Sequence, residues 1–451
     1  MPPNFLFLIA DDHRHNAIGS LGTSAVATPA LDGLIAAGTA LTHTYIMGST
    51  SAAVCMPSRA MLLTGRSLFR VFGLNPDNVS PYPMDPGIPT FPELLRTSGY
   101  RTYGVGKWHN EPSLYARSFD DGASIFFGGM SEHAAVPVHT FHPHGLYPLD
   151  AATPGHSFSS ELFVNSAAKL LHTHPADHPF CMYVAFTAPH DPRTPPPEFA
   201  RRYPASDIEL PPNFIPEHPF DNGELGGRDE QLAGHPRDPD EMRRHIADYY
   251  GMISHLDAQI GRLLDELEVT GHANDTIVIY TADHGLALGQ HGLLGKQNVY
   301  DHSLRVPLII RGPDVPPGER RDGLCYLMDV CPTILDLAGL DPPTECEGLS
   351  LVPMIQGAEL DVRESIFSAF QRDQEVGVDD PWQRSVRWGD WKLIETGAMG
   401  ERHTQLFNLV SDPWEMRNLA TQAAHAERLD AMRSRLMHER TVGGDTYVTG
   451  G

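Results

Sequence analysis

Two pairs of metal-competent side chains follow short apolar runs of the sequence. Asp11-Asp12 come directly after residues 5–10, and Asp283-His284 follow residues 276–281. Asp residues are also common helix caps, so a strand end or a cap is the plain alternative for the first pair. Adjacent carboxylates disfavour each other's charge unless a cation neutralises them. We therefore expect the four side chains to bind one hard divalent cation, with calcium preferred and manganese or magnesium as alternatives.

A twelve-residue segment, CMPSRAMLLTGR, begins at Cys55. The nearby Arg59 is expected to lower the pKa of the Cys55 thiol and make it reactive. An isolated cysteine before a helix would more often be an inert buried side chain. The fixed positions Cys-x-Pro-Ser-Arg and Leu-Thr-Gly-Arg are all present, and this pattern resembles the signature of the type I sulfatase family.

The resemblance implies a specific chemistry for residue 55. In that family, a separate formylglycine-generating enzyme reads Cys-x-Pro-x-Arg and oxidises the cysteine to formylglycine (3-oxoalanine). The hydrated aldehyde carries two hydroxyls: one attacks sulfur, and the other later loses its proton as sulfate is expelled. Covalent catalysis of this kind splits one difficult displacement into two easier steps. The resemblance also implies that an oxygen of modified residue 55 joins Asp11, Asp12, Asp283 and His284 around the metal, with Arg59 helping to hold the nucleophile.

Further segments resemble the same family and imply additional site residues. In Gly106-Lys107-Trp108-His109, the lysine corresponds to a sulfate ligand and the histidine to a base near the diol. His190, in Ala-Pro-His-Asp-Pro, corresponds to the histidine beside the leaving-group oxygen. Lys296 corresponds to the second sulfate-binding lysine. Imidazoles suit proton transfer near neutral pH, and cations suit the non-bridging oxygens of sulfate.

The sequence departs from the family pattern at two places, and the first of them, His284, keeps another function open. His284 stands where many sulfatases have asparagine, a change shared with phosphonate and phosphate ester hydrolases of the alkaline phosphatase superfamily. The first alternative is therefore a phosphonate monoester or phosphodiester hydrolase on the same scaffold. Asn110-Glu111 replaces a frequent Leu-Gly. The second alternative is not an enzyme: a metal-bearing protein that binds sulfated ligands, if Cys55 stays a thiol.

The elements that must position these residues alternate along the chain. Apolar runs at 5–10, 103–106, 180–186, 276–281 and 306–310 predict buried strands. Between 240 and 267, apolar residues recur at steps of three and four, which predicts a long amphipathic helix. This alternation predicts an α/β fold with a large, mostly parallel or mixed sheet sandwiched by helices. Ligands of such sheets bind at the carboxyl ends of strands, where the candidate residues lie.

The last hundred residues differ in pattern from the rest. Pro342-Pro343 marks a boundary, so we predict a catalytic domain over 1–345 and a smaller α+β subdomain over 346–451. The subdomain is expected to contain strands within 385–394 and 405–410 and a helix over 424–438. The Pro- and Gly-rich stretch 192–238 predicts a long surface excursion at the rim of the site, and 130–155 a second pocket-forming loop.

The composition of the chain limits the classes of partner that it is expected to bind. The 451 residues carry a formal net charge of −24, which argues against nucleic acid or anionic membrane as partners. Five irregularly spaced cysteines predict neither a disulfide framework nor a structural zinc site. No run reaches membrane-spanning length and no secretory leader is recognisable, so we expect a cytoplasmic location. The expected partners are a small-molecule or saccharide sulfate ester and, during maturation, the formylglycine-generating enzyme.

Overall fold

The computed structural model describes residues 2–22, 25–72, 84–372 and 380–446. Within them, eight strands form one large sheet in the order β11-β2-β10-β9-β1-β8-β4-β5. In chain order these are β1 (Asn4–Ala10), β2 (Thr39–Tyr45), β4 (Arg101–Lys107), β5 (Asp121–Phe126), β8 (Phe180–Ala185), β9 (Thr276–Ala282), β10 (Arg305–Arg311) and β11 (Glu319–Tyr326). The fold is α/β, as the sequence predicts.

The centre of the sheet is parallel and one side is mixed. β1 pairs in parallel with both β8 and β9, and β4 pairs in parallel with β8 and β5. β10 runs antiparallel to β9 and β2. All seven residues of β1 and of β9 are buried, as expected for strands covered on both faces. The predicted runs at 5–10, 103–106, 180–186, 276–281 and 306–310 are therefore confirmed as strands.

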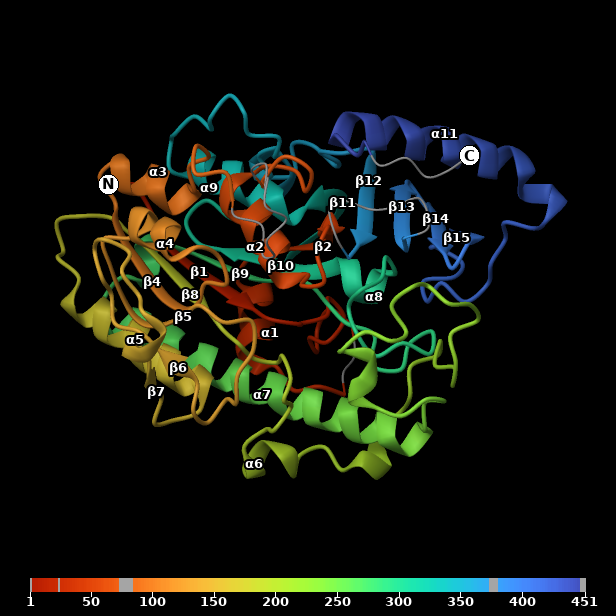
Figure 1. Cartoon of the computed structure of the whole chain (residues 1–451). Helices are drawn as coiled ribbons and strands as arrows, with labels where there is room; N and C mark the ends of the chain where they lie inside the picture. The colour runs from red at the N-terminus through yellow and green to blue at the C-terminus, as the bar shows by residue number, and fades with distance from the viewer. Residues whose placement is uncertain (1, 23–24, 73–83, 373–379, 447–451) are drawn as a thin grey trace.

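Helices cover both faces of this sheet (Figure 1). One layer contains α1 (Pro29–Ala36), α5 (Ser159–Thr173) and α7 (Pro239–Val269), and α7 packs against the other two. The opposite layer contains α2 (Cys55–Thr64), α3 (Phe91–Thr97), α4 (Pro112–Ser118) and α9 (Val330–Leu337). α7 confirms the predicted long helix: the Asp238 carboxylate caps its N-terminus by accepting from Glu241 N at 2.8 Å.

A second sheet lies beside the first and has five strands among the described residues, ordered β15-β14-β13-β12-β3. Its members are β3 (Gly48–Ser49), β12 (Ser365–Gln371), β13 (Trp382–Trp388), β14 (Trp391–Ala398) and β15 (Glu401–Asn408), and α11 (Ala426–Gly443) packs against it. The run at 385–394 is thus not one strand, because Gly389, with φ +56°, turns the chain between β13 and β14. β3 belongs to the N-terminal part of the chain yet pairs with β12, so this sheet reaches back to the segment just before Cys55.

Candidate active site

Strands β1, β4, β8 and β9 all end at one edge of the sheet, and a pocket of about 350 Å³ opens there. Cys55, His109, His190 and Lys296 line it. Asp11 and Asp12 follow β1, Asp283 and His284 follow β9, and Lys107 ends β4. The structure therefore brings the predicted metal and catalytic residues together at the carboxyl ends of the strands, where ligands of α/β sheets bind.

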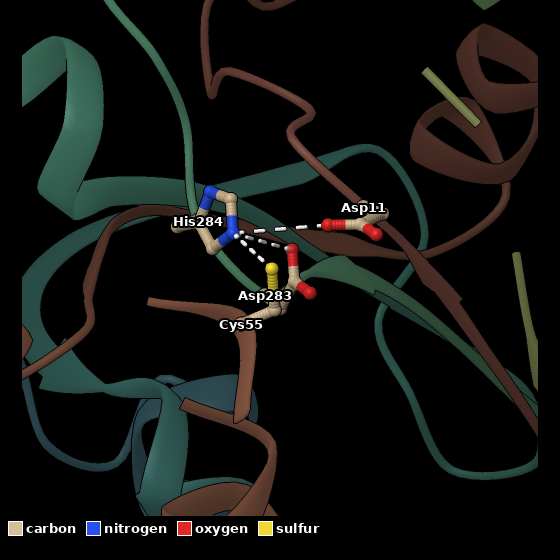
Figure 2. Close-up of side chains that lie close together, drawn as sticks. All are labelled: Asp11, Cys55, Asp283 and His284. Atoms are coloured by element: carbon tan, nitrogen blue, oxygen red, sulfur yellow. Dashed lines mark hydrogen bonds and ion pairs between the residues drawn. The ribbon is translucent and has the colours of Figure 1, made fainter. Parts of the chain in front are cut away.

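Four buried side chains form the candidate metal site (Figure 2). Asp11, Cys55, Asp283 and His284 each offer a ligand atom, and these atoms lie within 4.8 Å of one another. His284 Nε2 is 3.2 Å from Cys55 Sγ, 3.5 Å from Asp283 Oδ1 and 3.7 Å from Asp11 Oδ1. Asp12 belongs to a neighbouring group with Asp11 and His190.

The donor set fits a hard divalent cation. Asp11 Oδ1 is buried and accepts no hydrogen bond from the described residues. Burial, together with the neighbouring Asp11 carboxylate, raises the pKa of Asp283 to about 6. Crowded buried carboxylates of this kind are stabilised by a cation, and oxygen-rich sets suit calcium, magnesium or manganese. The Cys55 sulfur occupies the place of the oxygen that a formylglycine would carry.

Cys55 is the first residue of α2 and is almost fully buried. Burial alone would raise the pKa of its thiol, but Lys107, Lys296 and His284 hold that pKa well below its ordinary value. Lys296 Nζ lies 3.6 Å from the sulfur. An anionic atom at the side chain of residue 55 is therefore strongly favoured, which is the environment of a nucleophile.

Arg59 lies one turn along α2 from Cys55 and is held by two hydrogen bonds. Its Nε donates to Asp283 Oδ2 at 2.9 Å and its Nη1 to the carbonyl oxygen of Lys107 at 2.9 Å, and it is fully buried. The guanidinium thus fixes the metal-site carboxylate and the end of β4, and no hydrogen bond to the Cys55 side chain is among its contacts within the described residues. We assign Arg59 a positioning role.

Lys107 reaches the site because Gly106 lets β4 turn. Gly106 has φ +87°, and a Cβ there would lie 2.0 Å from the carbonyl oxygen of Ala185 in β8. The pairing of β4 with β5 also shifts register at this glycine. Lys107 Nζ then donates to Asp11 Oδ2 and to the carbonyl oxygen of Gly129.

Lys296 is held by a buried carboxylate in the loop preceding α7. Glu230 accepts from Gly295 N at 2.8 Å and from Leu294 N at 2.9 Å, and it pairs with the buried Arg237. These contacts fix the backbone next to Lys296, whose Nζ donates to Asp12 Oδ1 at 2.8 Å. The stretch 192–238 therefore supports a site lysine as well as forming the rim.

The two candidate histidines have opposite electrostatic environments. Burial, together with Lys107, lowers the pKa of His109, and His109 Nδ1 has no partner among the described residues. Burial would also lower the pKa of His190, but Asp12 raises it above its ordinary value. His190 Nδ1 lies 2.8 Å from the backbone carbonyl oxygen of Asp191. Titratable groups whose pKa values are pushed apart are suited to separate base and acid roles.

Several rim residues carry no sequence motif. Glu224, Arg228, Asp229, Gln297 and Arg372 line the pocket outside the cluster of site residues. Arg228 bridges Asp191 and Asp229, and Arg372 Nη2 lies 2.7 Å from Glu224 Oε2. Met130 adds the loop that follows β5. In the sequence, these residues are marked only by lying in, or close to, the loops that were expected to form the pocket.

The expectations about cysteines and membranes can also be compared with the structure. All five cysteines are free thiols. Among the described residues, no helix is both long and apolar enough to cross a membrane.

Comparison with known proteins gives a consistent assignment. A family model described as Sulfatase matches residues 3–340, and one described as N-sulphoglucosamine sulphohydrolase, C-terminal, matches residues 289–442. An N-acetylglucosamine-6-O-sulfatase of Bacteroides thetaiotaomicron is 26% identical, over 94% of this chain and 84% of its own. A solved structure in complex with its substrate D-glucosamine-2-N,6-O-disulfate superposes with a TM-score of 0.79 at 23% identity, covering 99% of both chains. The phosphonate monoester hydrolase of Agrobacterium radiobacter superposes with a TM-score of 0.77 at 24% identity, covering 98% of this chain and 96% of its own.

Proposed function

This chain belongs to the sulfatase family of sulfuric ester hydrolases, and from that premise we propose that it hydrolyses carbohydrate sulfate monoesters through residue 55. The observation that carries the proposal is the position of residue 55. Its side chain lies at the buried end of the pocket, beside the candidate metal ligands and within 3.6 Å of a lysine ammonium group. A formylglycine there supplies, when hydrated, a hydroxyl nucleophile and a route for releasing sulfate.

The cationic side chains bind the sulfate group of the substrate in this proposal. The protein carries a net charge of −24, so an anion is attracted only where positive charge is concentrated. Lys107 and Lys296 approach residue 55 from β4 and from the loop after β9. Asp11, Asp12, Asp283 and His284, with the oxygen of residue 55, would hold a calcium ion, which would add positive charge at the sulfate and at the nucleophile. Developing negative charge in the transition state is stabilised by cations already in place.

The two imidazoles divide the proton transfers. The pKa of His190 is raised and its side chain lines the pocket, so it is suited to donate a proton to the departing alcohol oxygen. His109 is neutral, has an unpartnered ring nitrogen and also lines the pocket, so it accepts the proton released when sulfate leaves. Asp191 supports His190 through its carbonyl oxygen and is itself anchored by Arg228.

A sugar suits the rim of the pocket. Arg228 and Arg372 have side chains 45% and 48% exposed, so part of each guanidinium can meet a substrate hydroxyl. Glu224, Asp229 and Gln297 add acceptors and an amide beside them. A relative named N-acetylglucosamine-6-O-sulfatase supports the same substrate class. A panel of sulfated monosaccharides, aryl sulfates and alkyl sulfates tests this, using protein co-expressed with a formylglycine-generating enzyme. Faster release of sulfate from the sugars is expected, and hydrolysis of aryl sulfates alone would contradict it.

His284 favours a second candidate function, phosphonate monoester or phosphodiester hydrolysis. It lies in the ligand cluster, and the phosphonate monoester hydrolase fold superposes over nearly the whole chain. The value of kcat/KM for matched aryl sulfate, phosphodiester and phosphonate substrates separates the two. A marked preference for the phosphorus esters would overturn the sulfatase proposal. A protein that binds sulfated ligands without turnover is identified by the intact mass of the peptide containing residue 55, since an unmodified thiol leaves no aldehyde nucleophile.

A further inference from the structure

A second cavity of about 520 Å³ shares no lining residue with the active-site pocket. Its walls come from the loop after β1, from α7, from α8 (Asp301–Leu304) with the start of β10, and from the loop after β15.

The cavity is lined by buried polar atoms that have no hydrogen-bond partner in the described part of the chain. They include Arg14 Nε, Asn213 Oδ1, Gln290 Nε2 and His302 Nε2, on residues that are each at most 4% exposed. A buried polar group left unsatisfied costs roughly 1–3 kcal/mol. Four such residues around one cavity indicate that the cavity holds a polar occupant.

Two guanidinium groups, those of Arg14 and Arg305, line the same cavity, together with the exposed Glu209 and two further carboxylates. Within the described part of the chain, the Arg14 guanidinium donates one hydrogen bond, a long one of 3.5 Å to the carbonyl oxygen of Ala287, and it lies over the ring of Tyr249. Arg305 donates through Nε to the carbonyl oxygen of Thr42 at 2.6 Å. Burial lowers the pKa of Arg305, although Tyr45 and Asp301 act to raise it.

Of the three carboxylates that line the cavity, Asp301 and Glu415 are already paired with a lysine. Asp301 Oδ1 and Glu415 Oε1 each lie 2.7 Å from Lys392 Nζ, and Asp301 Oδ2 also accepts from Tyr45 OH at 2.9 Å. The two carboxylates thus share one buried lysine, Lys392. The guanidinium of Arg387 donates to the same tyrosine hydroxyl and adds a further positive charge.

The imidazoles of His15 and His302 in the cavity are neutral, and each can still donate a hydrogen bond. Burial holds the pKa of His302 well below its ordinary value, and burial together with Arg305 does the same for His15. A neutral imidazole offers one N–H. The cavity therefore combines two guanidinium groups with neutral N–H donors, the donor set that recognises tetrahedral oxyanions.

We propose that this cavity is an anion site that binds a small tetrahedral oxyanion, sulfate or phosphate, between Arg14, Arg305 and the side-chain amide of Gln290. The bound anion satisfies the orphaned donors and neutralises the two guanidinium groups. It thereby ties the loop after β1 to the start of β10 and to the loop after β9. The site does not depend on the chemistry at residue 55, because the two cavities are separate.

Crystals of the wild-type protein soaked in sodium selenate test the position of the anion. An anomalous peak between Arg14 and Arg305 is expected, in addition to any peak in the active-site pocket. Peaks confined to the active-site pocket, or ordered waters alone in the second cavity, would overturn the proposal. The readout is occupancy, so it is separate from whether the enzyme turns over sulfate esters.

Binding in solution tests the residues. Calorimetry with sulfate and with phosphate should detect, in the wild type, a site that Arg305→Gln removes. Arg311→Gln is the matched control, because Arg311 ends the same strand, where it lies 3.9 Å from Glu268. Gln290→Met keeps the side-chain length and should weaken the site roughly tenfold. If Arg305→Gln does not fold, Gln290→Met and the selenate map decide. Equal affinity of all variants for both anions would contradict the proposal, and the tighter of the two anions identifies the ligand.

Discussion

Lys296 Nζ donates to Asp12 Oδ1 at 2.8 Å, joining the loop after β9 to the end of β1 across 284 residues of sequence. Burial would lower the pKa of Lys296, but Asp12 and Cys55 raise it well above its ordinary value. The ammonium group therefore stays charged over the whole physiological range, as a ligand for sulfate requires.

Replacing Lys296 should cost catalysis more than folding. Lys296→Ala is expected to lower kcat by about 10²- to 10³-fold, because it removes a fixed cation from the transition state. Steady-state kinetics on a sulfated sugar measure the effect. Lys169→Ala, on the exposed face of α5, is the matched control and should leave kcat unchanged. A Lys296→Ala enzyme with wild-type kcat would remove this lysine from the mechanism.

Removing the metal should inactivate and destabilise the protein. Asp11 and Asp283 are both buried, and each contributes a carboxylate to one cluster. A cation at 100 times its dissociation constant stabilises the fold by about 3 kcal/mol. Dialysis against a chelator should lower the melting temperature, and calcium should restore both stability and sulfate release.

The variant Asp283→Asn tests the ligand set directly. Elemental analysis should find less than one equivalent of metal in it, whereas Asp275→Asn, exposed just before β9, should retain the wild-type content. A full equivalent of metal in Asp283→Asn would show that the cation binds elsewhere.

Glu230 is expected to act on catalysis through Lys296. Glu230→Gln leaves the buried Arg237 without its counter-charge, and breaking a buried ion pair costs about 3–5 kcal/mol. Because Glu230 also accepts from Gly295 N, the variant should lower kcat with little change in metal content. Chemical denaturation and kinetics test this together, with the exposed Glu268→Gln as control. Unchanged stability and kcat would mean that the loop holds its shape without Glu230.

Two buried histidines should make the fold sensitive to acid. Burial lowers the pKa of His218 and of His291 to about 4 each. In the unfolded chain they bind protons near pH 6.5. Stability is therefore lost as the pH falls from about 6.5 through about 4, by at most about 3 kcal/mol per pH unit for the pair.

Urea denaturation at pH 7, 6 and 5 measures this dependence. The double variant His218→Gln/His291→Gln should have a smaller loss of unfolding free energy on acidification than the wild type. The exposed His144→Gln should behave as the wild type. Identical pH profiles for the double variant and the wild type would assign the acid sensitivity to other groups.

The central strands could be predicted because they are buried on both faces and form continuous apolar runs. β2 (TALTHTY) was not predicted, because its polar residues interrupt the apolar pattern that marks a buried strand. The hairpin of β13 and β14 was merged into one strand, because a two-residue turn at Gly389-Asp390 interrupts the pattern only briefly.

The site residues also divide into those that the sequence predicts and those that it does not. Residues such as Asp11 and Cys55 lie in local motifs at strand or helix ends, where one segment fixes their position. Glu230 and Arg228 lie in a long irregular loop, and their contacts depend on segments far away in sequence. Arg59 was expected to act on the thiol, and its hydrogen bond to Asp283 could not be read from the sequence. Direction of a side chain within a buried layer depends on tertiary packing, which spacing alone does not encode. The division at residues 345 and 346 stays a prediction.

Sulfate release by protein fully converted to formylglycine at residue 55, compared with Cys55→Ala, tests the central claim most directly. Peptide mass spectrometry establishes the conversion, and ion chromatography measures the sulfate released from a sulfated sugar. The account predicts sustained turnover by the converted protein and no turnover above background by Cys55→Ala with the same metal content. Equal rates for the two proteins would contradict it.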